Sequence, residues 1–206
     1  MNQAGTRIRP GSPTQGEGLA CARLLDMAAE GFFKILHGGA ALQILAQAYV
    51  ETGNKSSDEN TLFAEYDGQI AGMAVGFTDL QRKGFPKNTL ASCEGYPRIR
   101  ASALSFVFSP MLRILDSLAD GDFYLLSLAV DADHRGRGLG STLIEAMEGR
   151  AREAGATRFS LDVAAKNDGA QKVYRRHGFE TYARWPRCIH LRRLGLYRMA
   201  KELNDV

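Results

Sequence analysis

The sequence predicts a protein of the α/β (α+β) class, in which helices flank a mixed central sheet. Two β-rich runs separated by Asp67-Gly68 predict an antiparallel hairpin. Between residues 123 and 163 an apolar run, a glycine-rich loop, an amphipathic helix and a second β-rich run follow one another, as in two parallel strands joined by a crossover. The 206 residues suit one such domain, and 45% are hydrophobic, which is enough for a substantial core.

The N-terminal part of the chain is expected to be helical. Apolar residues recur at roughly helical spacing over 19–36, and again over 40–50 after the His37-Gly38-Gly39 break. We therefore expect two N-terminal helices within residues 1–60. The hairpin strands follow over 61–66 and 69–77.

A helical insertion is expected over 79–120, before the fourth strand. Residues 98–108 are amphipathic, and Ser109-Pro110 supplies an N-cap and a first-turn proline for a helix over 111–118. The later elements have clearer boundaries. In chain order we expect a buried strand over 123–130, a helix over 140–154, a strand over 158–163, a short helix over 168–176, and closing strands over 179–184 and 196–201.

The composition argues against several classes of protein, namely disulfide-rich, metal-binding, membrane and nucleic-acid-binding proteins. The three cysteines are far apart and lack metal-ligand spacing, so we expect neither a disulfide framework nor a metal site, and we predict a cytoplasmic protein. No apolar run approaches the roughly 20 residues that cross a bilayer, so no membrane partner is expected. Nucleic acid is also not expected, because no nucleic-acid-binding motif accompanies the net charge of +3. The arginines that crowd the last third form either a solvated face or an anion contact, and they are Arg175, Arg176, Arg184, Arg187, Arg192, Arg193 and Arg198.

A glycine-rich loop over 131–140 joins the buried strand to the next helix. Gly136, Gly138 and Gly140 would let backbone N–H groups approach an anion, and the helix N-terminus adds unpaired N–H donors. The alternative is a tight turn whose glycines only allow close helix–sheet packing. A P-loop is excluded because no Gly-Lys-Ser/Thr follows. A Rossmann dinucleotide site matches in part, with Asp162 as the ribose-binding acid, but its third glycine is misplaced.

Two motifs together resemble the Gcn5-related N-acetyltransferase (GNAT) superfamily. The first is the coenzyme motif Arg/Gln-x-x-Gly-x-Gly/Ala, which Arg135 to Gly140 matches at every fixed position. The second is an Asn followed by Ala-x-x-x-Tyr-x-x-x-Gly-Phe, and it is matched by Asn167, Ala170, Tyr174, Gly178 and Phe179. The resemblance covers the chain from about Thr61 onward, with 79–120 as a departure. It implies one GNAT-like domain over 1–206 whose fourth and fifth strands splay apart, with the acetyl-CoA-binding core over 121–184.

The resemblance also implies a binding role for particular residues. Acetyl-CoA would lie between the splayed strands, with no metal required. Backbone groups on the fourth strand and the side chain of Asn167 would bind pantetheine, and N–H groups from Arg135 to Ser141 would bind the pyrophosphate. The coenzyme-binding residues are then Leu128, Ala129, Val130, Arg135, Gly136, Arg137, Gly138, Leu139, Gly140, Ser141, Asn167, Ala170 and Tyr174.

The expected reaction is direct attack of an acceptor amine on the acetyl carbonyl in a ternary complex. The resemblance implies Tyr174 as the general acid for the departing thiolate. Some relatives carry a glutamate early in the fourth strand, where this chain has Tyr124, so the base must lie elsewhere. Glu30, Glu94 and Asp122 are the candidate acids. Glu94 is preferred because it is one of the few acids in residues 79–120 and stands beside the turn sequence Gly95-Tyr96-Pro97.

The acceptor is expected to be a small amine, bound by the N-terminal helices and the insertion. The main alternative is a non-catalytic acyl-CoA sensor that contacts a partner through its basic C-terminal region, and an NAD(P)-dependent oxidoreductase is a more distant one. The sequence leaves open whether the chain forms a homodimer.

Overall fold

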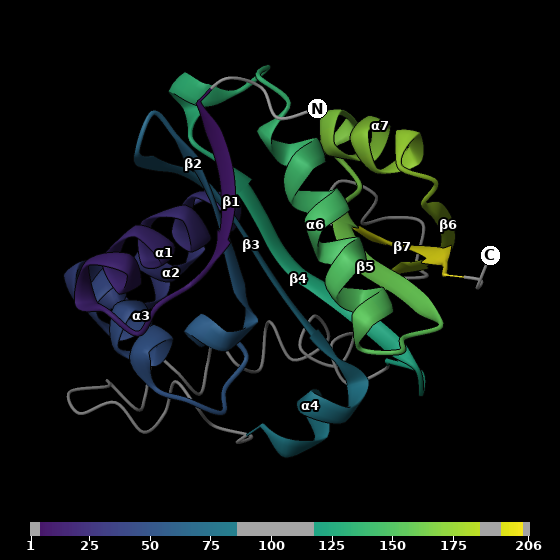
Figure 1. Cartoon of the computed structure of the whole chain (residues 1–206), viewed down its shortest axis with the longest axis horizontal. Helices are drawn as coiled ribbons and strands as arrows, with labels where there is room; N and C mark the ends of the chain where they lie inside the picture. The colour runs from purple at the N-terminus through teal and green to yellow at the C-terminus, as the bar shows by residue number, and fades with distance from the viewer. Residues whose placement is uncertain (1–4, 86–117, 186–194, 204–206) are drawn as a thin grey trace.

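One mixed sheet forms the centre of the protein, with strand order β1-β2-β3-β4-β5-β7-β6. A computed structural model describes residues 5–85, 118–185 and 195–203 (Figure 1). The strands are β1 (Thr6–Pro10), β2 (Thr61–Tyr66), β3 (Gln69–Thr78), β4 (Asp122–Val130), β5 (Arg158–Ala164), β6 (Glu180–Trp185) and β7 (Leu196–Glu202). The helices are α1 (Gln15–Ala28), α2 (Phe32–His37), α3 (Ala41–Val50), α4 (Asp79–Gly84), α6 (Leu139–Glu153) and α7 (Asp168–Arg176). Neighbouring strands are antiparallel except β4 and β5, which are parallel as predicted.

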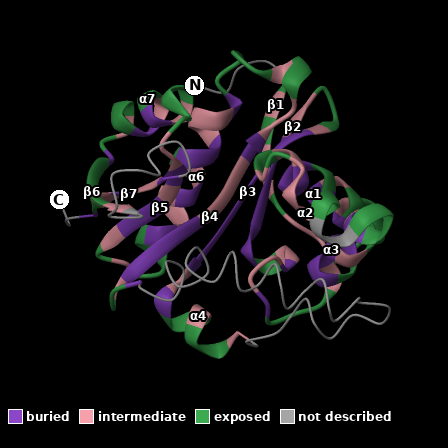
Figure 2. Cartoon of the chain, turned by 180° about the vertical axis from the view of Figure 1, so that it is seen from behind, coloured by how far each residue is buried: buried purple, intermediate pink, exposed green. Residues whose placement is uncertain are grey.

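Helices cover the two faces of the sheet, and among the described residues each face has its own large hydrophobic core. Successive residues of a strand point to opposite faces, so Leu62 of β2 joins the core under α6 and Phe63 joins the core under α1 and α3. Helix α6 buries one stripe, with Leu143 and Met147 fully inaccessible. The buried residues run along β3 and β4, the strands between the two layers (Figure 2).

The predicted hairpin is confirmed. Asp67 and Gly68 both have positive φ angles, of 49° and 77°, and Tyr66 pairs directly with Gln69 across a two-residue turn. This is the left-handed backbone that Asp-Gly favours between antiparallel strands.

The N-terminal region differs from the expectation of two helices. Strand β1 was not predicted, and it pairs antiparallel with β2 at the edge of the sheet. Helix α1 begins at Gln15 because the Thr14 hydroxyl caps the N–H of Glu17. It ends before Glu30 and Gly31, whose φ angles of 53° and 78° break the helix and make α2 a separate element.

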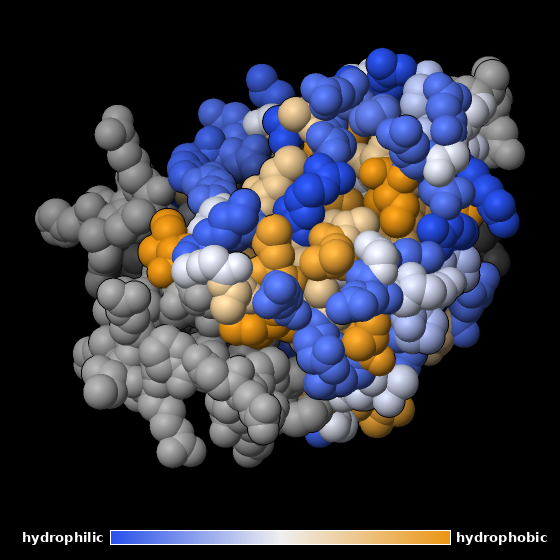
Figure 3. Space-filling view, turned by 90° about the vertical axis from the view of Figure 1, so that its left-hand side faces the viewer, coloured by the Kyte–Doolittle hydropathy of each residue, from blue (hydrophilic) through white to orange (hydrophobic). Residues whose placement is uncertain are grey.

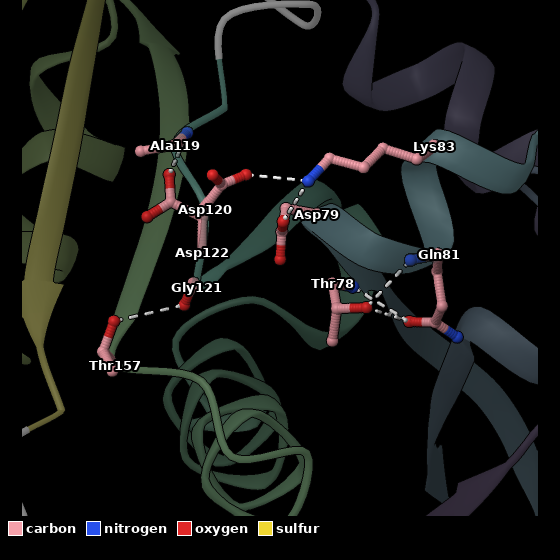
Figure 4. Close-up of polar contacts among 9 residues, drawn as sticks. All are labelled: Thr78, Asp79, Gln81, Lys83, Ala119, Asp120, Gly121, Asp122 and Thr157. Carbon is pink, nitrogen blue, oxygen red and sulfur yellow. Dashed lines mark hydrogen bonds and ion pairs between the residues drawn. The ribbon is translucent and has the colours of Figure 1, made fainter.

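The predicted insertion begins with α4, whose N-terminus carries a capping box between Thr78 and Gln81. Residues 86–117, which hold nearly all of the other predicted helical residues and Glu94, lie outside the described residues. The two ends that flank them are joined, because Lys83 Nζ lies 3.2 Å from Asp79 Oδ2 and 2.7 Å from Asp120 Oδ1 (Figure 4). The described segments on either side of this range, α4 and the residues before β4, therefore lie next to each other.

The N-terminal helices form a mixed surface. Figure 3 shows hydrophobic side chains that reach this surface between hydrophilic ones, and Leu19 of α1 and Ile35 of α2 are among the exposed large hydrophobic residues. Among the described helices, none is long and apolar enough to cross a membrane.

Candidate functional site

The strands β4 and β5 separate in the middle of the sheet. Their pairing runs from Asp122↔Arg158 to Leu125↔Leu161 and then stops. At the same level a bulge between β3 and β4 leaves Leu126 without a partner on β3. A bulge bends its strand and increases the local twist, so β4 diverges from β5 beyond this point, as predicted.

A cavity of about 200 Å³ occupies the gap between the separated strands. Its walls come from the end of α1, from β4 and β5, and from α7. Five of the lining residues have polar side chains, namely Glu30, Ser127, Asp162, Asn167 and Tyr174, and the others are apolar. The lining residues are Ala28, Glu30, Leu125, Leu126, Ser127, Leu128, Leu161, Asp162, Val163, Ala164, Asn167, Ala170 and Tyr174.

The glycine-rich loop follows β4 and leads directly into α6. Gly136 and Gly138 have φ angles of 77° and 83°, where an L side chain is strained, and Gly138 is the N-cap of α6 without a side-chain cap. The first helical bond of α6 runs from Thr142 N to Gly138 O. The N–H groups of residues 139–141 therefore precede the helical hydrogen bonds and remain free to bind an anion.

Two exposed arginines flank this helix terminus. Arg135 Nε donates to the Val130 carbonyl at 3.2 Å, which ties the loop to the end of β4. The Arg137 guanidinium lies 4.7 Å from the centre of the Tyr66 ring. The loop thus combines free N–H groups, glycine backbone and positive charge, and this donor set fits a pyrophosphate.

Helix α7 presents its signature residues to the cavity. Asn167 Oδ1 accepts a hydrogen bond from Ala170 N at 3.0 Å and so caps the helix. Tyr174 is buried, its ring packs edge-on against Phe179, and burial raises the pKa of its phenol to about 12. The structure thus brings Leu128, Asn167, Ala170 and Tyr174 to one cavity, whereas the side chain of Ala129 packs in the core under α1 and α3.

The three candidate acids have different positions. Glu30 lines the cavity and forms an ion pair with Lys166. Asp122 is 1% exposed and accepts hydrogen bonds from Arg158 at 2.7 and 3.1 Å, so it holds the paired ends of β4 and β5 and does not line the cavity. The structure therefore does not bring the candidate acid Asp122 to the cavity. Glu94 lies outside the described residues.

A buried polar cluster beside the cavity was not predicted. Asp162 accepts hydrogen bonds from Arg198 at 2.7 and 3.0 Å and from the Tyr124 hydroxyl at 2.9 Å. Burial and the Asp162 charge raise the pKa of Tyr124 well above its usual value. The clue in the sequence was an acid and an arginine inside apolar strands, and they pair because β5 and β7 place them opposite each other. These bonds hold Asp162 within the sheet and disfavour its role as a ribose-binding acid.

Residues 24–179 match the model of the Acetyltransferase (GNAT) family. This chain belongs to that family. A stretch of 64 residues is 47% identical to mycothiol acetyltransferase of Corynebacterium aurimucosum, and the match covers 31% of this chain. It covers only 20% of that relative's length.

Solved structures share the GNAT fold over nearly the whole chain. An N-acetyltransferase from Staphylococcus aureus Mu50 has a TM-score of 0.71 at 18% identity, with 94% of this chain and 99% of that chain covered. YncA from Salmonella typhimurium, solved with its cofactor acetyl-CoA, has a TM-score of 0.58 at 17% identity, with 98% and 96% covered. The mixed sheet with parallel β4 and β5 is therefore that of GNAT acetyltransferases.

Two other expectations concern charge and metal. The C-terminal arginines do not share one environment, because Arg198 is buried against Asp162 whereas Arg175 contacts Gln171 on α7. Arg187, Arg192 and Arg193 lie outside the described residues. Among the residues that the structure describes, no group of three or more potential metal ligands occurs.

Proposed function

We propose that this GNAT protein is an N-acetyltransferase that transfers the acetyl group of acetyl-CoA to a small-molecule amine in a ternary complex. The observation that carries the proposal is the cavity between β4 and β5. It has an anion-binding loop at the end of one strand and a buried, protonated Tyr174 in its wall.

The residues around the cavity suit the parts of acetyl-CoA. Backbone N–H groups of 139–141, with Arg135 and Arg137, would bind the pyrophosphate. The side of β4 that faces β5 makes no ladder with it beyond Leu125, so its backbone groups over 126–130 would bind the pantetheine amides. Asn167 and Ala170 would contact the arm from α7.

Acetyl-CoA supplies an acetyl thioester, and the protein supplies orientation and a proton. The amine nitrogen forms a bond to the carbonyl carbon, the carbon–sulfur bond breaks, and the amine loses its proton to solvent. Tyr174 donates a hydrogen bond or its proton to the departing sulfur and regains the proton from solvent. Because its pKa is about 12, the phenol stays protonated at neutral pH.

A small acceptor is in line with the name of one relative, mycothiol acetyltransferase. The prediction that residues 79–120, and Glu94 among them, form part of the acceptor pocket remains untested.

Thermal unfolding with added coenzyme tests the binding half of this proposal. Acetyl-CoA should raise the Tm, and Gly138→Glu should abolish the rise, because the new side chain brings bulk and negative charge to the pyrophosphate site. Gly149→Glu, a substitution on α6 with open space around it, is the matched control and should retain the rise. Stabilisation by NADH instead of acetyl-CoA would contradict the proposal.

A further inference from the structure

We propose that Asp162 binds the nitrogen of the acceptor amine, and that Tyr124 and Arg198 are positioning residues that fix its carboxylate. This inference rests on the proposed function and names the part of the cavity that selects an amine.

Asp162 lies on β5 at the point where this strand separates from β4. It is the residue directly after Leu161, the last residue of β5 that pairs with β4, so it stands where the gap opens. Phe159, Leu161 and Val163 point into the core under α6, and alternation therefore directs Asp162 to the opposite face. Tyr174 belongs to the α6 side. The two side chains reach one cavity from opposite faces of the sheet, which is where an acceptor and a thioester would have to meet.

The described residues use three of the hydrogen-bond acceptor positions of the Asp162 carboxylate. A carboxylate offers about four acceptor positions. From the described residues, Arg198 donates one hydrogen bond to each oxygen, and Tyr124 donates one to Oδ2. These bonds leave one position on Oδ1 unused by the described residues. Because Asp162 lines the cavity, the N–H of an amine bound there would occupy this position.

The hydrogen bonds around Asp162 also explain how an ionised carboxylate can be buried at this position. The side chains of Asp162 and Arg198 are 9% and 6% exposed. A lone charge at this depth would be costly, and the two-pronged arginine contact offsets much of that cost. Tyr124 adds a third bond and holds the plane of the carboxylate.

Amine binding to the enzyme–CoA complex is the test, measured by calorimetric titration with tyramine, spermidine, glucosamine and ethanolamine as probes. Asp162→Asn should raise the Kd of the amine that binds best by at least about tenfold, because hydrogen bonds to charged groups contribute that much. The rise in Tm with CoA should be unchanged.

Asp122→Asn is the matched control, because Asp122 is also a buried aspartate that pairs with an arginine on a neighbouring strand, but it does not line the cavity. It should lower stability and leave the amine Kd unchanged. Tyr124→Phe keeps the ring and the ion pair, and it should raise the amine Kd about three-fold through a less fixed carboxylate.

Three results would overturn the inference. They are equal amine affinities of Asp162→Asn and Asp122→Asn, no binding of any probe to the wild-type complex, or, should Asp162→Asn not fold, an unchanged amine Kd in Tyr124→Phe. Failure of the proposed function is distinct, because the wild-type protein would then release no CoA thiol from acetyl-CoA with any amine, whereas this inference is judged by the amine Kd values alone.

Discussion

The proposed role of Tyr174 requires a phenol that stays protonated in the cavity wall. Its position on α7 places the phenol in the cavity wall, and its burial disfavours the phenolate. A neutral phenol can donate to sulfur as negative charge develops there, whereas a phenolate could not. An ordinary phenol is already protonated at neutral pH, and burial extends that protonated range to more alkaline pH.

Replacing Tyr174 by Phe tests this role. The ring and its contact with Phe179 remain, so we expect kcat to fall by about 10² while the KM for acetyl-CoA stays nearly unchanged. Since Tyr174 ionises near pH 12, any alkaline limb of the wild-type profile below pH 10 belongs to another group and should persist in the variant. Steady-state rates from pH 6 to 10 measure both effects. A kcat within a few-fold of wild type would assign proton donation to water.

Site residues that belong to a sequence motif could be predicted from the sequence. Site residues that meet only because two strands pair could not. Leu128, Asn167 and Tyr174 could be placed together because their spacing follows a known pattern. Asp162 and Arg198 are 36 residues apart, and no local signal states that β5 and β7 pair with these two opposite each other.

The bulge between β3 and β4 is the element that opens the cavity. It depends on Gly76, because a Cβ there would lie 2.6 Å from Cε1 of Phe123 and 3.2 Å from the Tyr124 carbonyl. Phe123 in turn packs against Phe159 in the core under α6. A side chain at Gly76 would therefore move the strand at the point where β4 leaves β5.

Two glycine-to-alanine substitutions should have opposite effects. Gly76→Ala should lower the free energy of unfolding by about 1–3 kcal/mol, as overpacking does. Gly149→Ala, in α6 with nothing within 4 Å of the added Cβ, should raise it by about 0.5–1 kcal/mol. Urea unfolding measures both. Equal effects of the two substitutions would show that Gly76 has no special role at the bulge.

Element prediction succeeded where hydrophobic periodicity was strong. The hairpin, β5, α6 and α7 have nearly their predicted bounds, because each has a regular apolar pattern and a glycine or cap at its end. Strand β1 was missed because Thr6–Pro10 is a short edge strand with a single aliphatic residue, Ile8. The break between α1 and α2 was missed because Glu30 adopts a positive φ that non-glycine residues rarely show.

For the molecule as a whole, buried acids with raised pKa values predict loss of stability at high pH. Burial raises the pKa of Cys21 and of Tyr174 to about 12, and the unfolded chain releases these protons earlier, from pH 9 for the thiol and pH 10 for the phenol. The unfolded state then binds fewer protons than the folded state, so stability falls as pH rises.

We expect the free energy of unfolding to decline from about pH 9, by about 1.4 kcal/mol per pH unit for each group between its unfolded and folded pKa values. The decline should be steeper above pH 10, because buried tyrosines then also lose their protons in the unfolded chain but not in the folded protein. Urea titrations at pH 8, 9, 10 and 11 measure the slope, and Cys21→Ala should remove the part between pH 9 and 10. Stability that is constant up to pH 11 would contradict these shifts.

The central claim is that the gap between β4 and β5 is a site of acetyl transfer, and release of free thiol from acetyl-CoA tests it most directly. With a panel of primary amines, the wild-type protein should release CoA thiol in a reaction that depends on the amine and yields the N-acetylated product by mass spectrometry. If acetyl-CoA raises the Tm while no amine in the panel accelerates thiol release, the chain is an acyl-CoA-binding protein without transferase activity toward small amines, and the claim is wrong.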